Sequence, residues 1–300
     1  MWLRPAELAD APAVLAVLLA RDRADLGAPD HGLQGLLDLW RSGELDLPLD
    51  TIVAEDAAGI AGYAAVSRHG AMAVVAPDHQ SRGIGERLLE WTQHRERARQ
   101  QTVHRQWIAA ENTAARALLR AAGYARVRGY VRMAWSPQQP LPAPAAPAGV
   151  AIRPVDIDGD AVALHALDAV SFASVPDYVP ESLHEFRIEH LRGEQLDRAV
   201  SCVAARGGEL VGFLLALRWE DLGVGFVDLL AVHPGHRRRG IASALLGTAF
   251  AGLAAAGLRE AQLGVAADNP RAMTLYERVG MRPRFAFETW ERPLNEDPPR

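Results

Sequence analysis

The sequence predicts an α/β fold, with helices packed on a sheet, that occurs twice along the chain. Its 300 residues are enough for two domains of ordinary size. Two segments roughly 150 residues apart share motifs at the same spacing, and five prolines between positions 136 and 147 separate them. These observations predict an N-terminal domain over 1–136, a Pro-rich linker over 137–148 and a C-terminal domain over 149–300.

The repeat is clearest around a loop that follows an apolar run. The first copy reads Val75-Ala-Pro-Asp-His-Gln80-Ser-Arg-Gly83-Ile-Gly85, and the second reads Val232-His-Pro-Gly-His-Arg237-Arg-Arg-Gly240-Ile-Ala242. An Asn follows at the same distance, because 112 − 80 and 269 − 237 both equal 32. Upstream landmarks such as Gly62 and Gly212 are 150 positions apart, whereas the loops are 157 apart. Seven residues are therefore inserted in the second copy, and we place them near positions 219–223.

The elements of each copy follow from apolar runs and their boundaries. Residues 71–76 and 225–232 are apolar, β-favouring runs next to prolines, so they predict buried strands. Residues 83–99 and 240–256 predict helices. A further strand is predicted around Ile108 in the first copy and over 263–265 in the second. Asn112 and Asn269 then open the next helices, so each copy packs helices on a sheet.

Composition narrows the class of protein. The formal net charge of −5 argues against a nucleic-acid partner. A single cysteine, Cys202, excludes a disulfide framework and a Cys-based zinc site. The chain has no lysine, which excludes Schiff-base chemistry and a Walker A loop. We find no signal-peptide pattern and no membrane-spanning run, so we expect a cytoplasmic protein with no membrane partner.

The strand–loop–helix pattern suits an anionic ligand. The first N–H groups of a helix lack intrahelical acceptors, and the helix dipole favours negative charge there. Gly240 allows close backbone approach, Ala242 keeps the first turn slim, and Arg237 to Arg239 add positive charge. We predict a pyrophosphate cradle in each copy, although a tight turn and a solvated arginine face would explain the same residues.

These motifs resemble the GNAT superfamily of N-acetyltransferases. The family's phosphate loop reads Gln/Arg-x-x-Gly-x-Gly/Ala after its fourth strand. Its second motif is an Asn, an apolar helix with a Tyr, and a Gly, as in Asn269-Pro-Arg-Ala-Met-Thr-Leu-Tyr276-Glu-Arg-Val-Gly280. The resemblance covers nearly the whole chain as two tandem copies. It implies a mixed sheet with helices on both faces, which splays between its fourth and fifth strands to admit the pantetheine arm of acetyl-CoA.

The resemblance also implies roles for individual residues. Tyr276 would protonate the departing CoA thiolate, Asn269 would steady the pantetheine, and backbone N–H groups near 230–232 would hold the thioester oxygen. The implied acetyl-CoA-binding residues are Leu230, Ala231, Val232, Arg237, Arg238, Arg239, Gly240, Ile241, Ala242, Asn269 and Tyr276. A second CoA site in the first copy would consist of Val75, Gln80, Arg82, Gly83, Gly85 and Asn112.

Both motif residues also have purely structural explanations. Asn269 followed by Pro270 is a good helix start, with Asn as the N-cap. Tyr276 belongs to an apolar stripe at positions 272, 275, 276 and 279, which is typical of a helix face in the core.

The reaction requires a neutral amine. Deprotonating a lysine-like amine at pH 7 costs about 4.6 kcal/mol, so we expect a base or a desolvated pocket to help. Asp228 is our candidate base, directly or through a water, and Glu220 is the second candidate; Asp228 would also suit a salt bridge. His233 and His236 flank the loop, but no third ligand is evident, so no metal is expected.

The first copy lacks these groups. Leu119 stands where the second copy has Tyr276 (276 − 157), and Ala71 stands at the position of Asp228 (228 − 157). Leucine cannot donate a proton, although Tyr124 is an alternative donor. We therefore predict that the first copy keeps a CoA-shaped pocket but is catalytically weak or inert.

The acceptor is expected to be a small-molecule or peptide amine. Acidic residues in the helical region 171–192 (Asp177, Glu181 and Glu185) suit a cationic amine, although surface charge would explain them as well. Three alternatives stay open: a peptide or protein α-amine acetyltransferase, a non-catalytic acetyl-CoA-binding sensor or scaffold, and nucleic-acid binding through the arginine run. Net charge argues against the last, and nothing in the sequence determines the oligomeric state.

Overall fold

The computed structural model describes residues 1–138, 146–175 and 178–294. The chain forms two compact units. Unit 1 comprises Met1–Val131, Ala266–Asp268 and Phe285–Arg300, and unit 2 comprises Arg132–Val265 and Asn269–Arg284. The predicted mixed α/β class, with the fold present twice, is confirmed. The predicted linker falls largely on residues 139–145, which lie outside the described residues.

Unit 1 is built on strands in the order β1-β2-β3-β4-β5-β12. Neighbouring strands are antiparallel except β4 and β5, which are parallel. The strands are β1 (Trp2–Arg4), β2 (Thr51–Asp56), β3 (Gly59–Ser67), β4 (Gly70–Val75), β5 (Val103–Ala109) and β12 (Arg282–Pro293). The helices are η1 (Leu8–Asp10), α1 (Ala11–Asp25), α2 (Leu33–Arg41), α3 (Leu47–Asp50), η2 (Pro77–His79), α4 (Ile84–Ala98) and α5 (Thr113–Ala121).

Unit 2 repeats this plan with strands in the order β11-β10-β9-β8-β7. Here β10 and β11 are the parallel pair. Its strands are β7 (Ala151–Pro154), β8 (Cys202–Arg206), β9 (Glu209–Trp219), β10 (Val224–Val232) and β11 (Glu260–Ala266). Its helices are α6 (Ile157–Phe172), α7 (Leu183–Phe186), η3 (Arg187–Leu191, a π-helix), η4 (Pro234–His236), α8 (Ile241–Ala255) and α9 (Pro270–Arg278).

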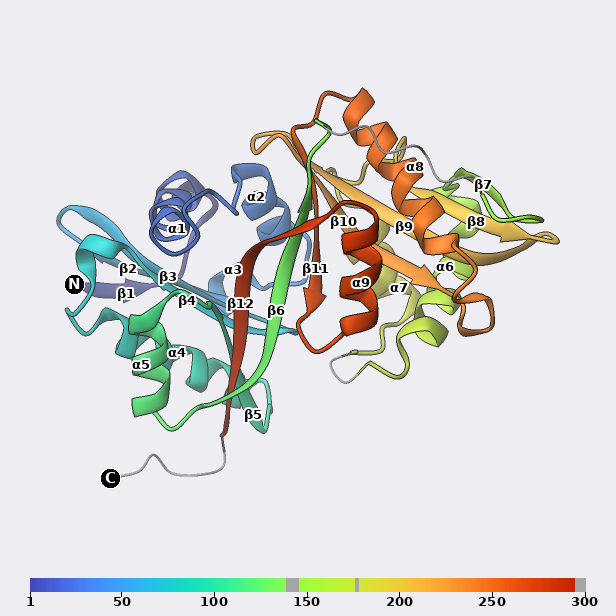
Figure 1. The fold of residues 1–300 in the computed structure, drawn as a ribbon. Coiled ribbons are helices and arrows are strands. Elements are labelled where there is room, and N and C mark those ends of the chain that lie inside the picture. The colour runs from blue at the N-terminus through green and yellow to red at the C-terminus, as the bar shows by residue number, and fades with distance from the viewer. Residues whose placement is uncertain (139–145, 176–177, 295–300) are drawn as a thin grey trace. The chain divides into compact units, whose positions relative to one another are not determined.

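Each unit places helices on both faces of its sheet because successive strand residues point to opposite faces. In unit 1, Tyr63 of β3 packs with α1, whereas the next residue, Ala64, packs with Ile84 and Leu88 of α4. In unit 2, α6 covers one face of β9 and β10 and α8 covers the other (Figure 1). Helix α8 is apolar on nearly every side, so most of its length is buried.

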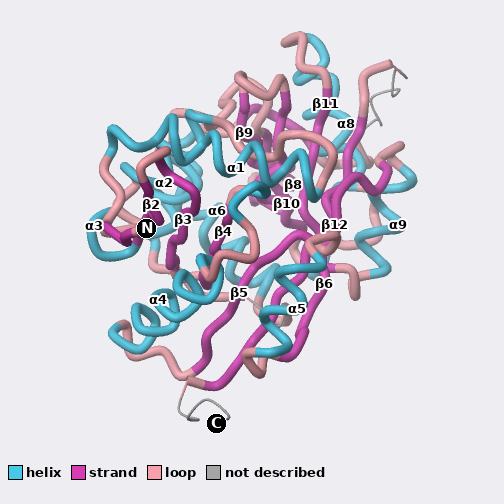
Figure 2. The backbone as a smooth tube through the Cα atoms, turned by 90° about the vertical axis from the view of Figure 1, so that its left-hand side faces the viewer, coloured by secondary structure: helices cyan, strands magenta, loops and turns pink. Residues whose placement is uncertain are grey.

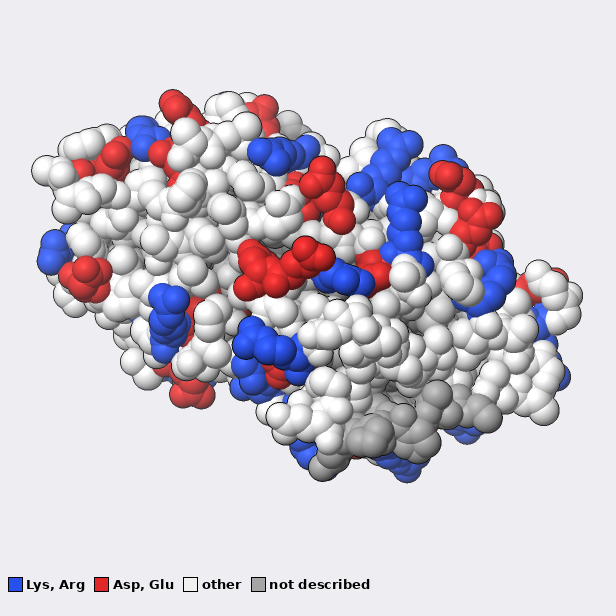
Figure 3. Space-filling view, turned by 90° about the horizontal axis from the view of Figure 1, so that it is seen from above, with Lys and Arg blue, Asp and Glu red and all other residues white. Residues whose placement is uncertain are grey.

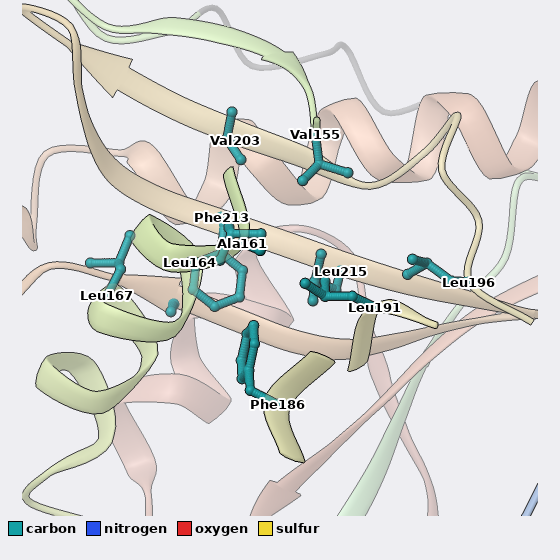
Figure 4. Packing of buried hydrophobic residues seen from close by; sticks show 11 residues of the cluster. Val155, Ala161, Leu164, Leu167, Phe186, Leu191, Leu196, Val203, Phe213 and Leu215 are labelled. Carbon is teal, nitrogen blue, oxygen red and sulfur yellow. The ribbon is translucent and has the colours of Figure 1, made fainter. Parts of the chain in front are cut away.

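The core of unit 2 lies between α6, α7 and the sheet (Figure 4). Phe186 from α7 and Leu164 from α6 meet Phe213 and Leu215 of β9, and all four side chains are fully buried. Burying each such side chain contributes about 1.5–3 kcal/mol. This core holds α7 and η3 against the strands that carry the candidate site.

Most of the last strand of the chain, from Phe285 onward, belongs to unit 1. Strand β12 pairs antiparallel with β5, from Phe287↔Ala109 to Pro293↔Val103. The two strands run side by side in both views (Figures 1 and 2). The predicted boundaries assign residues 149–300 to the second copy. The repeat alone does not reveal that β12 joins the sheet of unit 1, because tertiary structure decides which strand pairs with which.

The surface carries both signs of charge. On the face presented in Figure 3, acidic and basic side chains are interspersed in small groups. Among the described residues, no helix combines the length and the apolar character that crossing a membrane requires.

Candidate active site

The parallel strands of each unit separate partway along their length. In unit 2, β10 pairs with β11 from Val224↔Glu260 to Val227↔Leu263 and no further, although β10 continues to Val232. In unit 1, β4 and β5 pair only at Ala71↔Gln106 and Met72↔Trp107. Both units therefore contain the splay between fourth and fifth strands that the family resemblance implies.

A β-bulge places Asp228 at the start of the splay in unit 2. Ala216 of β9 pairs with Val227, and Leu215 pairs with Leu229, so Asp228 has no partner on β9. A bulge inserts one extra residue and redirects side chains locally. Here it directs the Asp228 carboxylate toward the α6 side, where it meets His190 of η3.

The register corrects the counterpart assigned to Asp228. In unit 1, Val66 pairs with Ala71 in an uninterrupted ladder, and the equivalent of Val66 is Ala216, which pairs with Val227. Ala71 therefore corresponds to Val227, and Asp228 is an added residue. The β9–β10 hairpin contains six further residues that the β3–β4 hairpin lacks, since (227 − 216) − (71 − 66) = 6. The seven inserted residues thus lengthen both strands and the turn, beyond the predicted positions 219–223.

The loop after β10 has the shape expected of an anion cradle. Gly240, the N-cap of α8, has φ +82°, and Arg238 has φ +62°. Because Gly240 has no side chain to cap the helix, the N–H groups of the first turn, which begins Ile241-Ala242, stay available. Ser81 (φ +59°) and Gly83 (φ +75°) repeat this conformation in unit 1.

The three arginines of the loop differ in what they contact. Arg237 donates from Nε to the Val232 carbonyl at 3.1 Å and from Nη2 to the Ser171 carbonyl at 2.7 Å. Its guanidinium thus ties the loop to the ends of β10 and α6. Arg238 and Arg239 are exposed and make no hydrogen bond or ion pair with the described residues. Their guanidinium groups are therefore wholly available to an anion.

Asn269 and Asn112 both cap helices, as their structural explanation predicts. The side-chain oxygen of Asn269 accepts from the Ala272 N–H at 3.1 Å, and that of Asn112 accepts from the Ala115 N–H at 2.9 Å. In unit 1 the Asn112 amide also donates to Asp25 at 2.9 Å. The Asn269 amide has no second partner among the described residues, so only unit 2 keeps this donor available.

Tyr276 is half-buried on α9, and its hydroxyl makes no hydrogen bond with the described residues. Burial raises the pKa of Tyr276 to about 12, so it holds its proton at neutral pH. No residue of α9 is fully buried, whereas the counterpart Leu119 is 2% exposed and packs in the unit 1 core with Trp290. The core explanation therefore fits Leu119 better than Tyr276.

Tyr124, the alternative donor of unit 1, is part of a buried network. Its hydroxyl accepts from Gln93 at 2.8 Å and lies 2.8 Å from Nδ1 of His104. Burial raises the pKa of Tyr124 to about 12 and lowers that of His104 to about 4. With both partners engaged, Tyr124 serves the core of unit 1.

His190 is the site residue that sequence reasoning missed. Its Nδ1 lies 2.7 Å from Oδ2 of Asp228, and its Nε2 lies 3.5 Å from Oε2 of Glu181. Burial opposes the charged imidazole, but the two carboxylates outweigh it and raise the pKa of His190 to about 10. The sequence did offer one signal: at the repeat offset of 150, His190 stands where the first copy has Trp40 of α2, so a titratable side chain takes the place of an aromatic one.

The other predicted acidic residues take different places. Glu185 forms a capping box with Ser182 at the start of α7, and Asp177 lies outside the described residues. Glu220, the second candidate base, is exposed in the turn between β9 and β10. Of these groups, only Glu181 joins the cluster around Asp228.

The two loop histidines do not gather a ligand set. Nδ1 of His233 accepts from the Gly235 N–H at 3.1 Å, and no third ligand joins His233 and His236 among the described residues. Glu181, Glu189 and His190 each bring one ligand-type atom within 4.8 Å of the others. Both ring nitrogens of His190 face carboxylates, an arrangement that suits a protonated imidazole between two acids.

The two units also differ beside the splay. Leu217 of β9 packs on the α6 side of the sheet, and Phe226, its partner on β10, faces the same side. Phe226 also pairs with Gln262 of β11, so Gln262 and, two residues later, Gly264 face the α6 side as well. A Cβ at Gly264 would meet no described atom within 4 Å. In unit 1 the equivalent residue is Trp107, whose indole donates to the His69 carbonyl at 3.2 Å. Position 264 therefore leaves open space, whereas the large side chain at position 107 reaches back to the residue before β4.

Comparisons with known proteins agree with this architecture. A model of the acetyltransferase (GNAT) family matches residues 166–281, and an acetyltransferase (GNAT) domain model matches residues 48–126. The chain is 31% identical to the mycothiol acetyltransferase of Parafrankia sp. (strain EAN1pec), over 97% of this chain and 98% of that one. It is 33% identical to the mycothiol acetyltransferase of Streptomyces avermitilis, over 90% of this chain and 87% of that one.

Solved structures share the fold. A GCN5-related N-acetyltransferase from Sphaerobacter thermophilus has a TM-score of 0.83 and 26% identity, covering 98% of this chain and 96% of that chain. A tandem GNAT protein from the clavulanic acid biosynthesis pathway has a TM-score of 0.79 and 16% identity, covering 99% of both chains. The second likeness concerns the fold alone.

Proposed function

Because this chain belongs to the acetyltransferase (GNAT) family, we propose that its unit 2 transfers an acetyl group directly from acetyl-CoA to a primary amine. One observation carries the assignment to unit 2: the bulge that brings Asp228 to the start of the splay has no equivalent in unit 1. The hydroxyl of Tyr276 supports it, since the equivalent Leu119 has no proton to give.

The residues of unit 2 fit acetyl-CoA. The first turn of α8 offers N–H groups to the pyrophosphate, with Arg238 and Arg239 beside them. Beyond Val227, the edge of β10 that faces β11 has no strand partner among the described residues, so backbone groups of 228–232 are available to the pantetheine and the thioester oxygen. The Asn269 amide is a further donor. We assign Arg237 a structural part, because two carbonyls hold its guanidinium.

The proposed reaction exchanges one bond for another. The amine nitrogen bonds to the thioester carbon, the carbon–sulfur bond breaks, and the CoA thiolate leaves. One ammonium proton passes to Asp228, directly or through a water, before attack; Tyr276 then gives its proton to the thiolate and is reprotonated by the second proton that the new amide nitrogen loses. Asp228 thereby offsets part of the roughly 4.6 kcal/mol needed to neutralise the amine at pH 7.

The acceptor we propose is the desacetyl form of mycothiol. The tandem layout is similar to that of mycothiol synthase, and the relatives reported above are mycothiol acetyltransferases. The carboxylates of Asp228 and Glu181 suit an acceptor that arrives as a cation. Mass spectrometry of reactions with desacetylmycothiol, small polyamines and peptide α-amines tests this choice, and acetylation of the peptides alone would favour the peptide acetyltransferase alternative.

For unit 1 we propose a non-catalytic role. It keeps the loop conformation around Gly83, but Asp25 engages the Asn112 amide and Leu119 replaces the proton donor. The conserved loop geometry leaves unit 1 two uses, as a scaffold or as a second CoA site, and the binding experiment below separates them.

Calorimetric titration of acetyl-CoA into Gly240→Arg and Gly83→Arg tests the assignment. Both glycines have positive φ, so any side chain also adds backbone strain of about 1 kcal/mol. Gly257→Arg and Gly27→Arg are matched controls, because these glycines have φ of +78° and +74° and open space around them. We expect only Gly240→Arg to abolish tight binding and, with it, acetyl transfer.

The other outcomes either contradict the proposal or decide between the two uses of unit 1. Binding that survives Gly240→Arg but is lost in Gly83→Arg would move the working site to unit 1. Two equivalents in the wild type, with one lost in each variant, would make unit 1 a second CoA site. A wild type that binds no acetyl-CoA would leave a scaffold protein.

A further inference from the structure

We propose that His190 is the positioning residue that holds Asp228 ready to accept the proton of the amine. The inference rests on the proposed function of Asp228, and it adds a residue from a helix 38 positions earlier in the chain. His190 does not itself touch the reacting atoms in this proposal. It acts by fixing one oxygen of the base.

The contact geometry is that of a clamp. Nδ1 of His190 donates to Oδ2 of Asp228 at 2.7 Å, which is the length of a charge-assisted hydrogen bond. The opposite ring nitrogen faces Oε2 of Glu181 at 3.5 Å. An imidazole between two carboxylates carries both protons, so its orientation is fixed from two sides and Oδ1 of Asp228 is left for the acceptor.

Packing holds the imidazole in place. The His190 side chain is 10% exposed, and its ring centroid lies 5.0 Å from that of Phe186, which is fully buried. Two more titratable groups of α6 face this region. The Asp168 carboxylate accepts from the Tyr178 hydroxyl at 3.0 Å, and Nε2 of His165 donates to the backbone carbonyl of Glu181 at 2.8 Å.

The backbone around His190 departs from the fold's regular pattern. Residues 187–191 form a π-helix, whereas the equivalent segment of unit 1, at 37–41, belongs to the regular helix α2. π-Helical turns are rare and are found frequently at functional sites. The two segments have the same length, so the change in winding is not caused by an insertion.

The β-bulge at Asp228 and the π-helix at His190 occur in the same unit. Unit 2 has the bulge at Asp228 and the π-helix at His190, and these two irregular segments meet through one hydrogen bond. Unit 1 has neither: its ladder is unbroken at Ala71, and Trp40 stands at the position of His190, where its indole donates to the Tyr63 hydroxyl at 2.9 Å. A purely structural histidine gives no reason for both irregularities to be confined to the same unit.

The test is a double-mutant cycle on the full chain, with acetyl transfer to the amine that the acceptor screen identifies. His190→Leu keeps apolar packing against Phe186 but removes the donor. His190→Asn keeps an N–H donor near the position of Nδ1. Both are made in the wild type and in Asp228→Asn, and melting temperature and acetyl-CoA affinity are measured for each.

We expect His190→Leu to lower kcat about 10- to 30-fold, with acetyl-CoA affinity unchanged. His190→Asn should restore kcat to within about fivefold of the wild type. In the Asp228→Asn background, His190→Leu should change kcat less than about twofold, because its effect passes through Asp228.

Two results would overturn the inference while leaving the proposed function intact. In the first, Asp228→Asn loses activity whereas His190→Leu is folded and fully active. In the second, His190→Leu causes an equal loss with and without Asp228. A fully active Asp228→Asn variant would instead refute Asp228 as the base, and the inference with it.

Discussion

In unit 1 a salt bridge between Arg4 and Asp10 ties β1 to the start of α1, and in unit 2 Arg153 and Asp160 tie β7 to α6 in the same way. Both pairs are 2.7 Å apart, and in both the arginine holds the pKa of the carboxyl below its usual range. The loops after β4 and β10 share their positive-φ residues, and the Asn caps match as well. The scaffold has thus been kept in both copies.

The differences gather around the splay. Where unit 2 has His190, Gly264 and Tyr276, unit 1 has Trp40, Trp107 and Leu119. Each replacement in unit 1 is apolar or aromatic and fills space, and the bulge residue is absent altogether. The comparison teaches that two copies of one scaffold can differ as a set at a single place, because strained and polar groups are costly and persist only where the surroundings hold them.

The largest effect is expected at the proton donor. Tyr276→Phe should lower kcat about 100-fold or more, with acetyl-CoA affinity unchanged, because the thiolate must then leave without a positioned acid. Tyr124→Phe in unit 1 is the matched control and should leave kcat within about twofold. Steady-state assays of thiol release measure both, and equal losses in the two variants would end the claim that the units differ in chemistry.

The open space at Gly264 comes next. Gly264→Trp copies unit 1 and should lower kcat/KM for the amine about 100-fold by displacing it from the thioester. Gly264→Ala should be nearly neutral, since its Cβ meets open space. Trp107→Gly, the reciprocal change in unit 1, should not alter turnover. A Gly264→Trp variant with normal KM and kcat would show that the acceptor approaches elsewhere.

The smallest effect concerns stability and pH. Glu288 of β12 is buried in unit 1 and accepts from Arg116, Arg126 and Trp290. Its counterpart on strand β6 (Ala125–Trp135) is Val131 (288 − 157). Burial opposes ionisation of Glu288, but the Arg116 and Trp290 hydrogen bonds outweigh it and lower its pKa. Glu288→Gln should therefore lower the free energy of unfolding by about 2 kcal/mol at pH 7.

The pH dependence of this effect has a definite sign. Because the folded-state pKa lies below the unfolded value, the stabilisation is complete above pH about 4.5 and is lost as pH falls through the folded pKa. Urea unfolding at pH 7 and pH 3.5 should show the gap between wild type and Glu288→Gln closing on acidification. Glu291→Gln, which breaks a more exposed pair with Arg105, is the control and should cost about 0.5 kcal/mol. A gap that widens at low pH would contradict this account.

Features that depend on neighbouring residues were determined by the sequence. The duplication, the positive-φ turn at Gly240, the Asn caps 32 positions after each loop and the contrast between Tyr276 and Leu119 can all be read from local motifs and one offset. A helix start or a left-handed turn needs only a few adjacent residues, so the local sequence is sufficient.

Features that depend on distant partners were decided by tertiary structure. The bulge at Asp228 is defined by the register of β9, and its contact with His190 joins residues 38 positions apart. Arg237 hydrogen-bonds the Ser171 carbonyl because α6 ends beside the loop. Strand β12 completes the sheet of unit 1 with a segment from the far end of the chain. Register and strand partners follow from long-range packing, which no local pattern records.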